Sequence, residues 1–236
     1  MARPPQIVAM GGGGFLMEPD NPLLDRFVLS TAAVPKPKIC FLGTATGDYQ
    51  GFIDSFYACF NPQPCIPTHL SLFKPPTRDL RDFVLEQDAI YVGGGNTRAM
   101  LALWREWGLD AILRDAWLAG IVMAGLSAGS ICWFKQGLSD SVVAGELHPI
   151  KCLGFLRGSH CPHYDGEPYR QPTYRHLIKE GKLESGYAAD DGAALHFVGE
   201  ELVGVVSSRE AAKAYSVRCV GSEVEETALP AKWLGA

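Results

Sequence analysis

The most informative stretch of this sequence is IVMAGLSAGSICWF, residues 121–134. Its first residues are continuously apolar, as expected of a strand that is buried on both faces. The apolar run then breaks at GLSAG, residues 125–129, which matches the pattern G-x-S-x-G. This pattern places a serine on a tight turn between a strand and a helix, where the neighbouring residues must be small. Ser127 is therefore the first candidate for a nucleophile.

The segments around this motif alternate between short apolar runs and longer amphipathic ones. Such alternation predicts an α/β fold whose mostly parallel sheet is covered by helices on both faces. Residues 193–198, 202–206 and 214–220 are predicted to continue the sheet or to form a small hairpin. The remaining strands are expected at 6–10, 38–42, 68–73, 89–92 and 121–124, with helices at 22–31, 52–60, 79–86, 97–107 and 110–118.

Three glycine-rich loops follow predicted strands, at residues 11–14, 93–95 and 125–129. In open α/β sheets, ligands bind beyond the carboxyl ends of the strands. These loops are therefore expected to surround a ligand site. The first of them is a further pocket candidate, but it lacks the lysine of a phosphate-binding loop and the G-x-G-x-x-G pattern. No cofactor is expected.

Composition narrows the range of functions. The 236 residues are expected to form one α/β domain, 1–236. A formal net charge of -5 and the lack of Lys/Arg runs argue against binding to nucleic acid. The seven cysteines are scattered and form no zinc pattern, so they are expected to be reduced and no metal site is expected. No apolar segment approaches the roughly 20 residues that cross a bilayer. A cytoplasmic protein without a membrane partner is expected.

A catalytic serine needs a base, because its hydroxyl is a weak nucleophile at neutral pH. His160 and His163 lie in the loop-like stretch GSHCPHYDGE, where catalytic groups are often displayed, and composition does not choose between them. The other four histidines are expected to be structural or solvent-facing: His69, His148, His176 and His196. The acid that orients the base could be Asp140, Asp165, Asp190 or Asp191.

Four segments together resemble peptidase family S51, which includes the aspartyl dipeptidases called peptidase E and, more distantly, the cyanophycinases. The resemblance implies a fold similar to class I glutamine amidotransferases, a Rossmann-like three-layer α/β sandwich. It also implies a serine peptidase that hydrolyses short peptides and acts on dipeptides, Asp-X among them. The segments occur in the family's order: YVGGGNTRAML at 91–101, GLSAGS at 125–130, CPHYD at 161–165 and DDG at 190–192.

The resemblance also implies roles for individual residues. Ser127 falls on the nucleophile and His163 on the base. The orienting acid falls on Asp191, where the family more often has Glu, with Asp190 as the neighbouring candidate. The backbone amides of Gly95 and Ala128 fall on the oxyanion hole.

Substrate binding is implied for Asn96 and for Asp140, which lies thirteen positions after the serine, where peptidase E has an important acid. In the aspartyl dipeptidases, a longer loop and a Gly-Glu-Thr-Arg segment grip the acidic side chain. Here the interval is shorter, and Pro168 and Tyr169 come before Arg170. Arg170 and Arg175 remain candidates for binding a carboxylate, and a strict preference for aspartate is not implied. A homo-oligomer remains open.

Two other classes of function compete with this interpretation. An α/β-hydrolase esterase uses the same turn but orders its triad as Ser, acid, His, which Asp140 with His163 or His196 would satisfy; its HGGG loop is absent. A non-catalytic binding module predicts that Ser127 and His163 do not come together. A glutamine amidotransferase is disfavoured because its nucleophile is cysteine.

Overall fold

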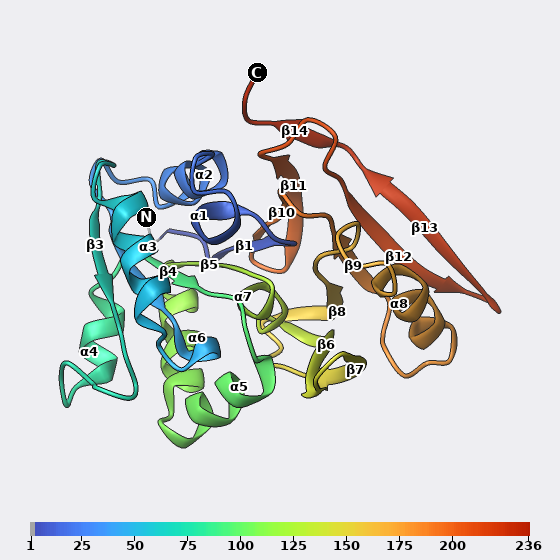
Figure 1. The fold of residues 1–236 in the computed structure, drawn as a ribbon, viewed down its shortest axis with the longest axis horizontal. Helices are drawn as coiled ribbons and strands as arrows, with labels where there is room; N and C mark the ends of the chain where they lie inside the picture. Colours follow the sequence, from blue (N-terminus) through green and yellow to red (C-terminus); the bar gives the residue numbers. More distant parts are fainter. Residues whose placement is uncertain (1–2) are drawn as a thin grey trace.

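The computed structural model describes residues 3–236, which form two β-sheets with helices packed around them (Figure 1). The first sheet has eight strands in the order β14-β11-β10-β1-β5-β4-β2-β3. In chain order these are β1 (Gln6–Met10), β2 (Lys38–Leu42), β3 (Ile66–His69), β4 (Ala89–Val92), β5 (Val122–Leu126), β10 (Ala193–Val198), β11 (Glu201–Ser207) and β14 (Ala231–Trp233).

The first sheet is parallel over the strands that carry the glycine-rich loops. β3, β2, β4, β5 and β1 pair in parallel, and β10 then joins the edge of β1 in the antiparallel direction. The carboxyl ends of β1, β4 and β5 therefore meet at one edge of the sheet. The glycine-rich loops at 11–14, 93–95 and 125–129 directly follow these three strands. They therefore lie at the same edge of the sheet, as predicted.

Both faces of this sheet are covered, as the continuously apolar strands predict. Ile7 and Ala9 of β1 pack in one core and Val8 and Met10 in another, because successive side chains of a strand point to opposite faces. The first core includes residues of α4 (Leu80–Leu85), α5 (Thr97–Glu106), α6 (Leu109–Leu118) and α7 (Ala128–Ile131). The second includes residues of α1 (Gly14–Met17), α2 (Leu23–Thr31) and α3 (Gln50–Phe60).

The second sheet has six strands in the order β13-β12-β9-β8-β6-β7 and mixes parallel with antiparallel pairs. Helix α8 (Arg170–Lys179) packs on it through Tyr174, Leu177 and Ile178 (Figure 1). Its strands are β6 (Phe134–Val143), β7 (Glu146–Lys151), β8 (Leu156–Cys161), β9 (Gly186–Ala189), β12 (Ala214–Val220) and β13 (Glu223–Leu229).

The prediction of one mostly parallel sheet is therefore incomplete. Residues 214–220 do form a strand, but it belongs to the second sheet. Residues 158–161, which were predicted to lie in a loop, are part of strand β8. The strand predicted at 68–73 lies at Ile66–His69 instead. Its parallel partner β2 pairs Phe41 with His69, the last residue of β3, so the ladder ends there.

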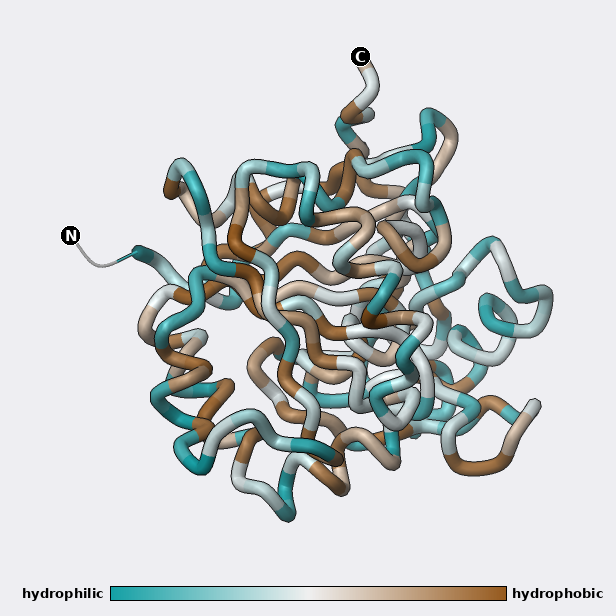
Figure 2. Tube along the Cα trace, turned by 60° about the vertical axis from the view of Figure 1, so that its left-hand side comes forward, coloured by the Kyte–Doolittle hydropathy of each residue, from teal (hydrophilic) through white to brown (hydrophobic). Residues whose placement is uncertain are grey.

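Hydrophobic segments run through the interior of the molecule, and hydrophilic segments form much of its outer loops (Figure 2). Among residues 3–236, no helix combines the length and the apolar character needed to cross a bilayer.

Candidate active site

The turn after β5 holds Ser127 in a strained backbone conformation, with φ 54° and ψ −117°. Positive φ is uncommon for residues other than glycine, and such strain clusters at functional sites. The flanking glycines make the turn possible. A Cβ on Gly125 would lie 2.4 Å from the carbonyl oxygen of Gly129, and a Cβ on Gly129 would lie 2.1 Å from that of Val92. Backbone contact on both sides therefore excludes any larger residue.

The loop after β4 lies against this serine. A Cβ on Gly94 would come within 3.2 Å of the Cβ of Ser127. Gly95 has φ 133°, and a Cβ there would lie 2.5 Å from the carbonyl oxygen of Ala45, so this position also requires glycine. Within residues 3–236, the backbone amides of Gly95 and Ala128 have no hydrogen-bond partner. Asn96 is the N-cap residue of α5, and its side chain accepts a hydrogen bond from the amide of Ala99 at 2.8 Å.

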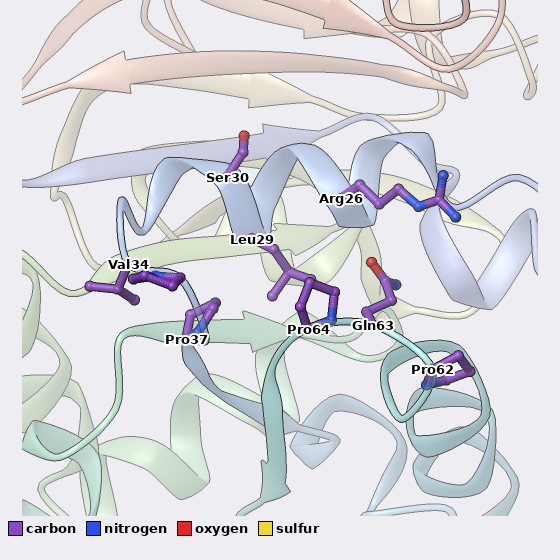
Figure 3. A pocket seen from close by; sticks show the side chains of 9 residues that line it. Arg26, Leu29, Ser30, Val34, Pro37, Pro62, Gln63 and Pro64 are labelled. Carbon is purple, nitrogen blue, oxygen red and sulfur yellow. The ribbon is translucent and has the colours of Figure 1, made fainter.

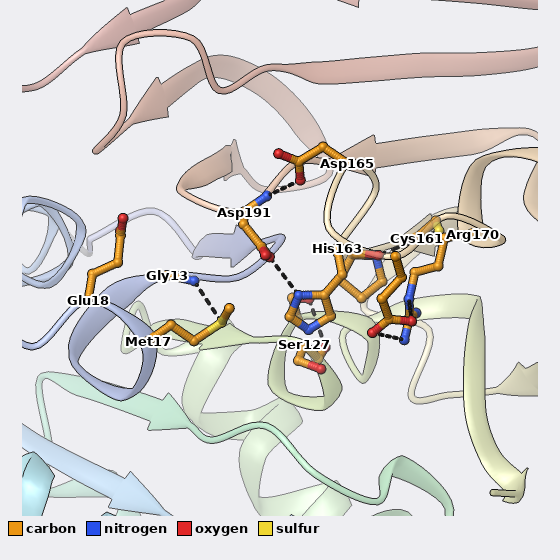
Figure 4. Close-up of polar contacts among 12 residues, drawn as sticks. Gly13, Met17, Glu18, Ser127, Cys161, His163, Asp165, Arg170 and Asp191 are labelled. Atoms are coloured by element: carbon orange, nitrogen blue, oxygen red, sulfur yellow. Dashed lines mark hydrogen bonds and ion pairs between the residues drawn. The ribbon is translucent and has the colours of Figure 1, made fainter. Parts of the chain in front are cut away.

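His163 and Asp191 form a close pair beside the serine (Figure 4). A hydrogen bond of 2.6 Å joins Nδ1 of His163 to Oδ1 of Asp191, and each side chain is only 14% exposed. Burial by itself would raise the pKa of Asp191. The hydrogen bond and charge of His163, with Arg209 and Arg170 nearby, nevertheless hold that pKa below its usual value. Asp191 is therefore ionised at neutral pH.

Two further features fix the position of Asp191. Its backbone amide donates to Oδ1 of Asp165 at 2.8 Å. Gly12, which pairs with Asp191 in an isolated bridge, leaves room for the carboxylate, since a Cβ there would lie 2.1 Å from Oδ1. A Cβ on Gly166 would lie 2.7 Å from Oδ2. The sequence showed the first glycine-rich loop as a pocket candidate, but it gave no sign that Gly12 contacts the acid.

The structure distinguishes between the histidines and acids that the sequence left as candidates for the base and its orienting acid. His160 lies in β8, is fully buried and stacks on Phe134. Burial lowers the pKa of His160 to about 3, and its Nδ1 contacts the carbonyl of Tyr187. Asp190 accepts from the backbone amide of Lys213, and His196 bonds to Gln6. Asp191 alone of the four candidate acids bonds to a candidate histidine within the described residues.

Two cavities meet at Ser127, and both are also lined by His163 and Gly95. The first, of about 330 Å³, is polar and contains Asp140 and Arg170 among its lining residues. The second, of about 290 Å³, is lined mainly by apolar side chains. In the part of the chain that the structure describes, Oγ of Ser127 makes no hydrogen bond to His163. Such catalytic contacts are often long without substrate.

The polar cavity contains most of the predicted substrate-binding residues. Asn96 and the exposed Asp140 line it. Arg170 also lines it but is already engaged. Its Nε and Nη2 donate to the two carboxylate oxygens of Glu167 at 2.6 and 3.2 Å, and its Nη1 donates to the carbonyl of Leu138 at 3.3 Å. Arg175 does not line this cavity, because it binds Glu226 of β13 at 3.1 Å. Glu167 is a site residue that the sequence did not single out.

A larger cavity of about 420 Å³ lies elsewhere, between α2 and the loops that precede β2 and β3 (Figure 3). Prolines and aliphatic side chains form much of its wall, and Arg26 is the ionisable residue in it. Among the described residues that line it, no nucleophile is hydrogen-bonded to a base, whereas Ser127 and His163 together line the two cavities described above. Among residues 3–236, no group of three or more His, Cys, Asp or Glu side chains is placed to hold a metal ion.

Comparison with known proteins shows the family of this chain. The family model described as "Peptidase family S51" matches residues 7–205. The chain belongs to peptidase family S51. It is therefore a peptidase. A protein of Bacillus subtilis (strain 168) called "Uncharacterized peptidase YgaJ" is 59% identical to this S51 peptidase over 230 residues, which cover 98% of this chain and 99% of that protein.

Two solved structures share the fold of this S51 peptidase. One is a peptidase from an acI-B1 Actinobacterium, with a TM-score of 0.68 and 16% identity over 96% of this chain and 97% of that one. The other is described as a putative peptidase E protein from Listeria monocytogenes EGD-e, with a TM-score of 0.58 and 16% identity over 98% of this chain and 100% of that one. At such low identity these similarities establish the mixed α/β fold.

Proposed function

We propose that this S51 peptidase is a serine peptidase that hydrolyses short peptides, and dipeptides above all, through an acyl-enzyme. One observation carries the proposal: His163, which is hydrogen-bonded to Asp191, lines the same two cavities as Ser127, which stands on a strained turn. We further propose that the first sheet and its helices form the Rossmann-like three-layer sandwich of the class I glutamine amidotransferases.

The protonation states favour His163 as the base. Because Asp191 is ionised, it can only accept the hydrogen bond, so Nδ1 of His163 carries a proton; in the neutral imidazole, Nε2 is then free to accept one. Nε2 takes the proton of Ser127 as Oγ attacks the peptide carbonyl, and returns it to the leaving nitrogen as the C–N bond breaks. Water then attacks the Ser127 ester, with His163 again as the base.

The amides of Gly95 and Ala128 are proposed to stabilise the oxyanion. Both come from loops that border Ser127, and neither has a partner within the described residues. Donors of this kind, fixed in place before the reaction, typically contribute about 3 kcal/mol each to the stability of the transition state.

The polar cavity is proposed to bind the amino-terminal residue of the substrate. A free amino terminus is cationic, and Asp140 and Glu167 give this cavity two carboxylates against the one guanidinium of Arg170. An aspartyl side chain would have to share Arg170 with Glu167, which already occupies two of its nitrogens. We therefore propose that Asp-X dipeptides are accepted without a strict preference over neutral ones, and that Arg175 has no part in binding.

An active-site probe tests the nucleophile. A fluorophosphonate should label the wild-type protein and fail to label Ser127→Ala. Ser130→Ala is the matched control, because Ser130 belongs to the same motif but donates its hydroxyl to the backbone carbonyl of Ser127; it should still be labelled. Labelling that survives Ser127→Ala would exclude Ser127 as the nucleophile.

A substrate panel tests the class of reaction. Asp-X and neutral dipeptides should both be cleaved by the wild-type protein, with similar kcat/KM. Simple esters are assayed in parallel as a second class of substrate. The esterase alternative needs Asp140 to orient the histidine, whereas Nδ1 of His163 bonds to Asp191. Hydrolysis of esters without any hydrolysis of dipeptides would favour that alternative.

A further inference from the structure

We propose that the apolar cavity beside Ser127 binds the hydrophobic side chain of the residue that leaves when the peptide bond is cut. This inference rests on the proposed function, since it assigns the second half of a peptide whose amino-terminal residue lies in the polar cavity. It gives the enzyme a preference for dipeptides with a large apolar second residue.

The first glycine-rich loop and α1 build one wall of this cavity. Phe15 anchors α1: it is 2% exposed and packs edge-on against Phe41, Phe56 and Tyr91. Its backbone amide donates to Oδ1 of the buried Asp25 at 3.2 Å. With Phe15 held in the core, the next two side chains of α1 are left on the cavity side.

Those two side chains, Leu16 and Met17, line the cavity together with Phe52 of α3 and Leu126 of β5. Met17 is 42% exposed, although a large apolar side chain gains most by being buried. Its sulfur is held by the amide of Gly13 at 3.2 Å, as Figure 4 shows. An exposed apolar side chain fixed in place beside a nucleophile is a surface suited to a hydrophobic ligand.

The two cavities differ in charge, and this difference assigns the ends of the substrate. The polar cavity contains Asp140, Glu167 and Arg170. Among residues 3–236, His163 is the one ionisable side chain that lines the apolar cavity. A cationic amino terminus is stabilised only in the first. The residue on the other side of the scissile bond must then point its side chain into the second.

The size of the cavity limits what can enter it. At about 290 Å³ it lies at the lower limit of small-molecule pockets, which fits one side chain rather than a long peptide. Leucine or phenylalanine in the second position would displace water from Leu16, Met17 and Phe52, and a glycine there would not. Burying such a side chain favours binding by about tenfold or more.

Calorimetry on the inactive Ser127→Ala protein tests this assignment without requiring turnover. Ala-Leu is expected to bind at least about tenfold more tightly than Ala-Gly. Leu-Gly carries its apolar side chain on the first residue, and is expected to gain no such advantage over Ala-Gly. Adding Phe52→Ala should reduce the ratio of the affinity for Ala-Leu to the affinity for Ala-Gly to about threefold or less. Leu16→Ser, in the same background, is a second variant with the same expected direction.

Phe73→Ala is the matched control, because Phe73 is 60% exposed and lines a different cavity, with Leu103. It should leave the ratio unchanged. The inference is overturned if Leu-Gly is the tighter ligand, or if both Phe52→Ala and Leu16→Ser preserve the Ala-Leu to Ala-Gly ratio.

The outcome is separable from that of the proposed function. A wild-type protein that cleaves dipeptides but shows no dependence on the second residue would contradict this inference alone. A protein that cleaves no peptide and yet binds Ala-Leu through Phe52 would contradict the proposed function and leave the apolar subsite in place.

Discussion

Two histidines three positions apart in HCPH lie in opposite environments. His160 is inside β8, where burial lowers its pKa to about 3 and its ring stacks on Phe134. His163 lies just beyond the end of that strand, with φ 53°, and binds Asp191 at 2.6 Å at the border of two cavities. One is held neutral in a core, and the other is placed where it can exchange a proton with a ligand.

The difference shows that the end of the strand, and not the residue type, separates a structural histidine from a candidate base. Within β8 the backbone is fixed by its neighbours in the sheet, and the side chain can only face a core or solvent. After Cys161 the chain leaves the sheet and adopts a left-handed conformation at His163, which turns the imidazole toward Asp191 and Ser127 (Figure 4).

The largest expected effect separates the two histidines directly. His163→Ala should lower kcat/KM for dipeptides by about 10⁴-fold or more, because the proton of Ser127 then has no acceptor. His160→Asn, which keeps a donor for the carbonyl of Tyr187, should change kcat/KM by less than about threefold while lowering stability. Steady-state kinetics with thermal unfolding measures both. Equal losses of activity in the two variants would break the comparison.

The next effect concerns the acid. Asp191→Asn should lower kcat/KM by about 10³- to 10⁴-fold, because an amide favours the wrong tautomer of His163. Asp190→Asn is the matched neighbour: its carboxylate accepts from the amide of Lys213 and does not touch the histidine, so its kcat/KM should stay near the wild-type value. A larger loss in Asp190→Asn than in Asp191→Asn would move the orienting role to Asp190.

A smaller loss of activity is expected when Gly12, which leaves room for the carboxylate of Asp191, is replaced. Gly12→Ala would place a Cβ 2.1 Å from Oδ1 of Asp191 and 2.9 Å from Nδ1 of His163. Displacing the pair by about 1 Å should lower kcat by about 100-fold. Gly204→Ala in β11 is the control, since a Cβ there meets no atom of the described residues within 4 Å apart from its chain neighbours. Wild-type kcat in Gly12→Ala would show that the pair tolerates displacement.

The smallest effect is on stability and depends on pH. The unfolded chain protonates His160 near its ordinary pKa of about 6.5, whereas burial keeps the folded protein from doing so until about pH 3. Unfolding therefore takes up a proton in this range, and the free energy of unfolding falls as the pH falls, by up to about 1.4 kcal/mol per pH unit from this group.

Urea denaturation of wild type and His160→Asn between pH 4 and 6 isolates this contribution. The variant should lose less stability per pH unit on acidification. Asp25, whose pKa burial raises to about 6, acts in the opposite direction, but it is present in both proteins and cancels in the comparison. Identical slopes would mean that His160 takes up its proton over the same pH range in the folded and the unfolded protein.

The sequence by itself determined the parts that depend on local backbone requirements. A continuously apolar strand followed by GLSAG predicted a buried strand and a constrained serine turn, since only glycine fits beside the carbonyls of Val92 and Gly129. The alternation of strands and helices predicted the parallel sheet, and the order of the four segments predicted the family.

Only the tertiary structure decided which side chains meet. The six-stranded second sheet was not predicted, because its strands are short or only partly buried and carry no continuous apolar pattern. Asp191 reaches His163 from 28 residues away, through a bridge to Gly12 at the other end of the chain. Arg175 is turned to Glu226 of β13, at a sequence separation of 51 residues. Such contacts depend on where distant strands end in space, and local sequence does not encode that position.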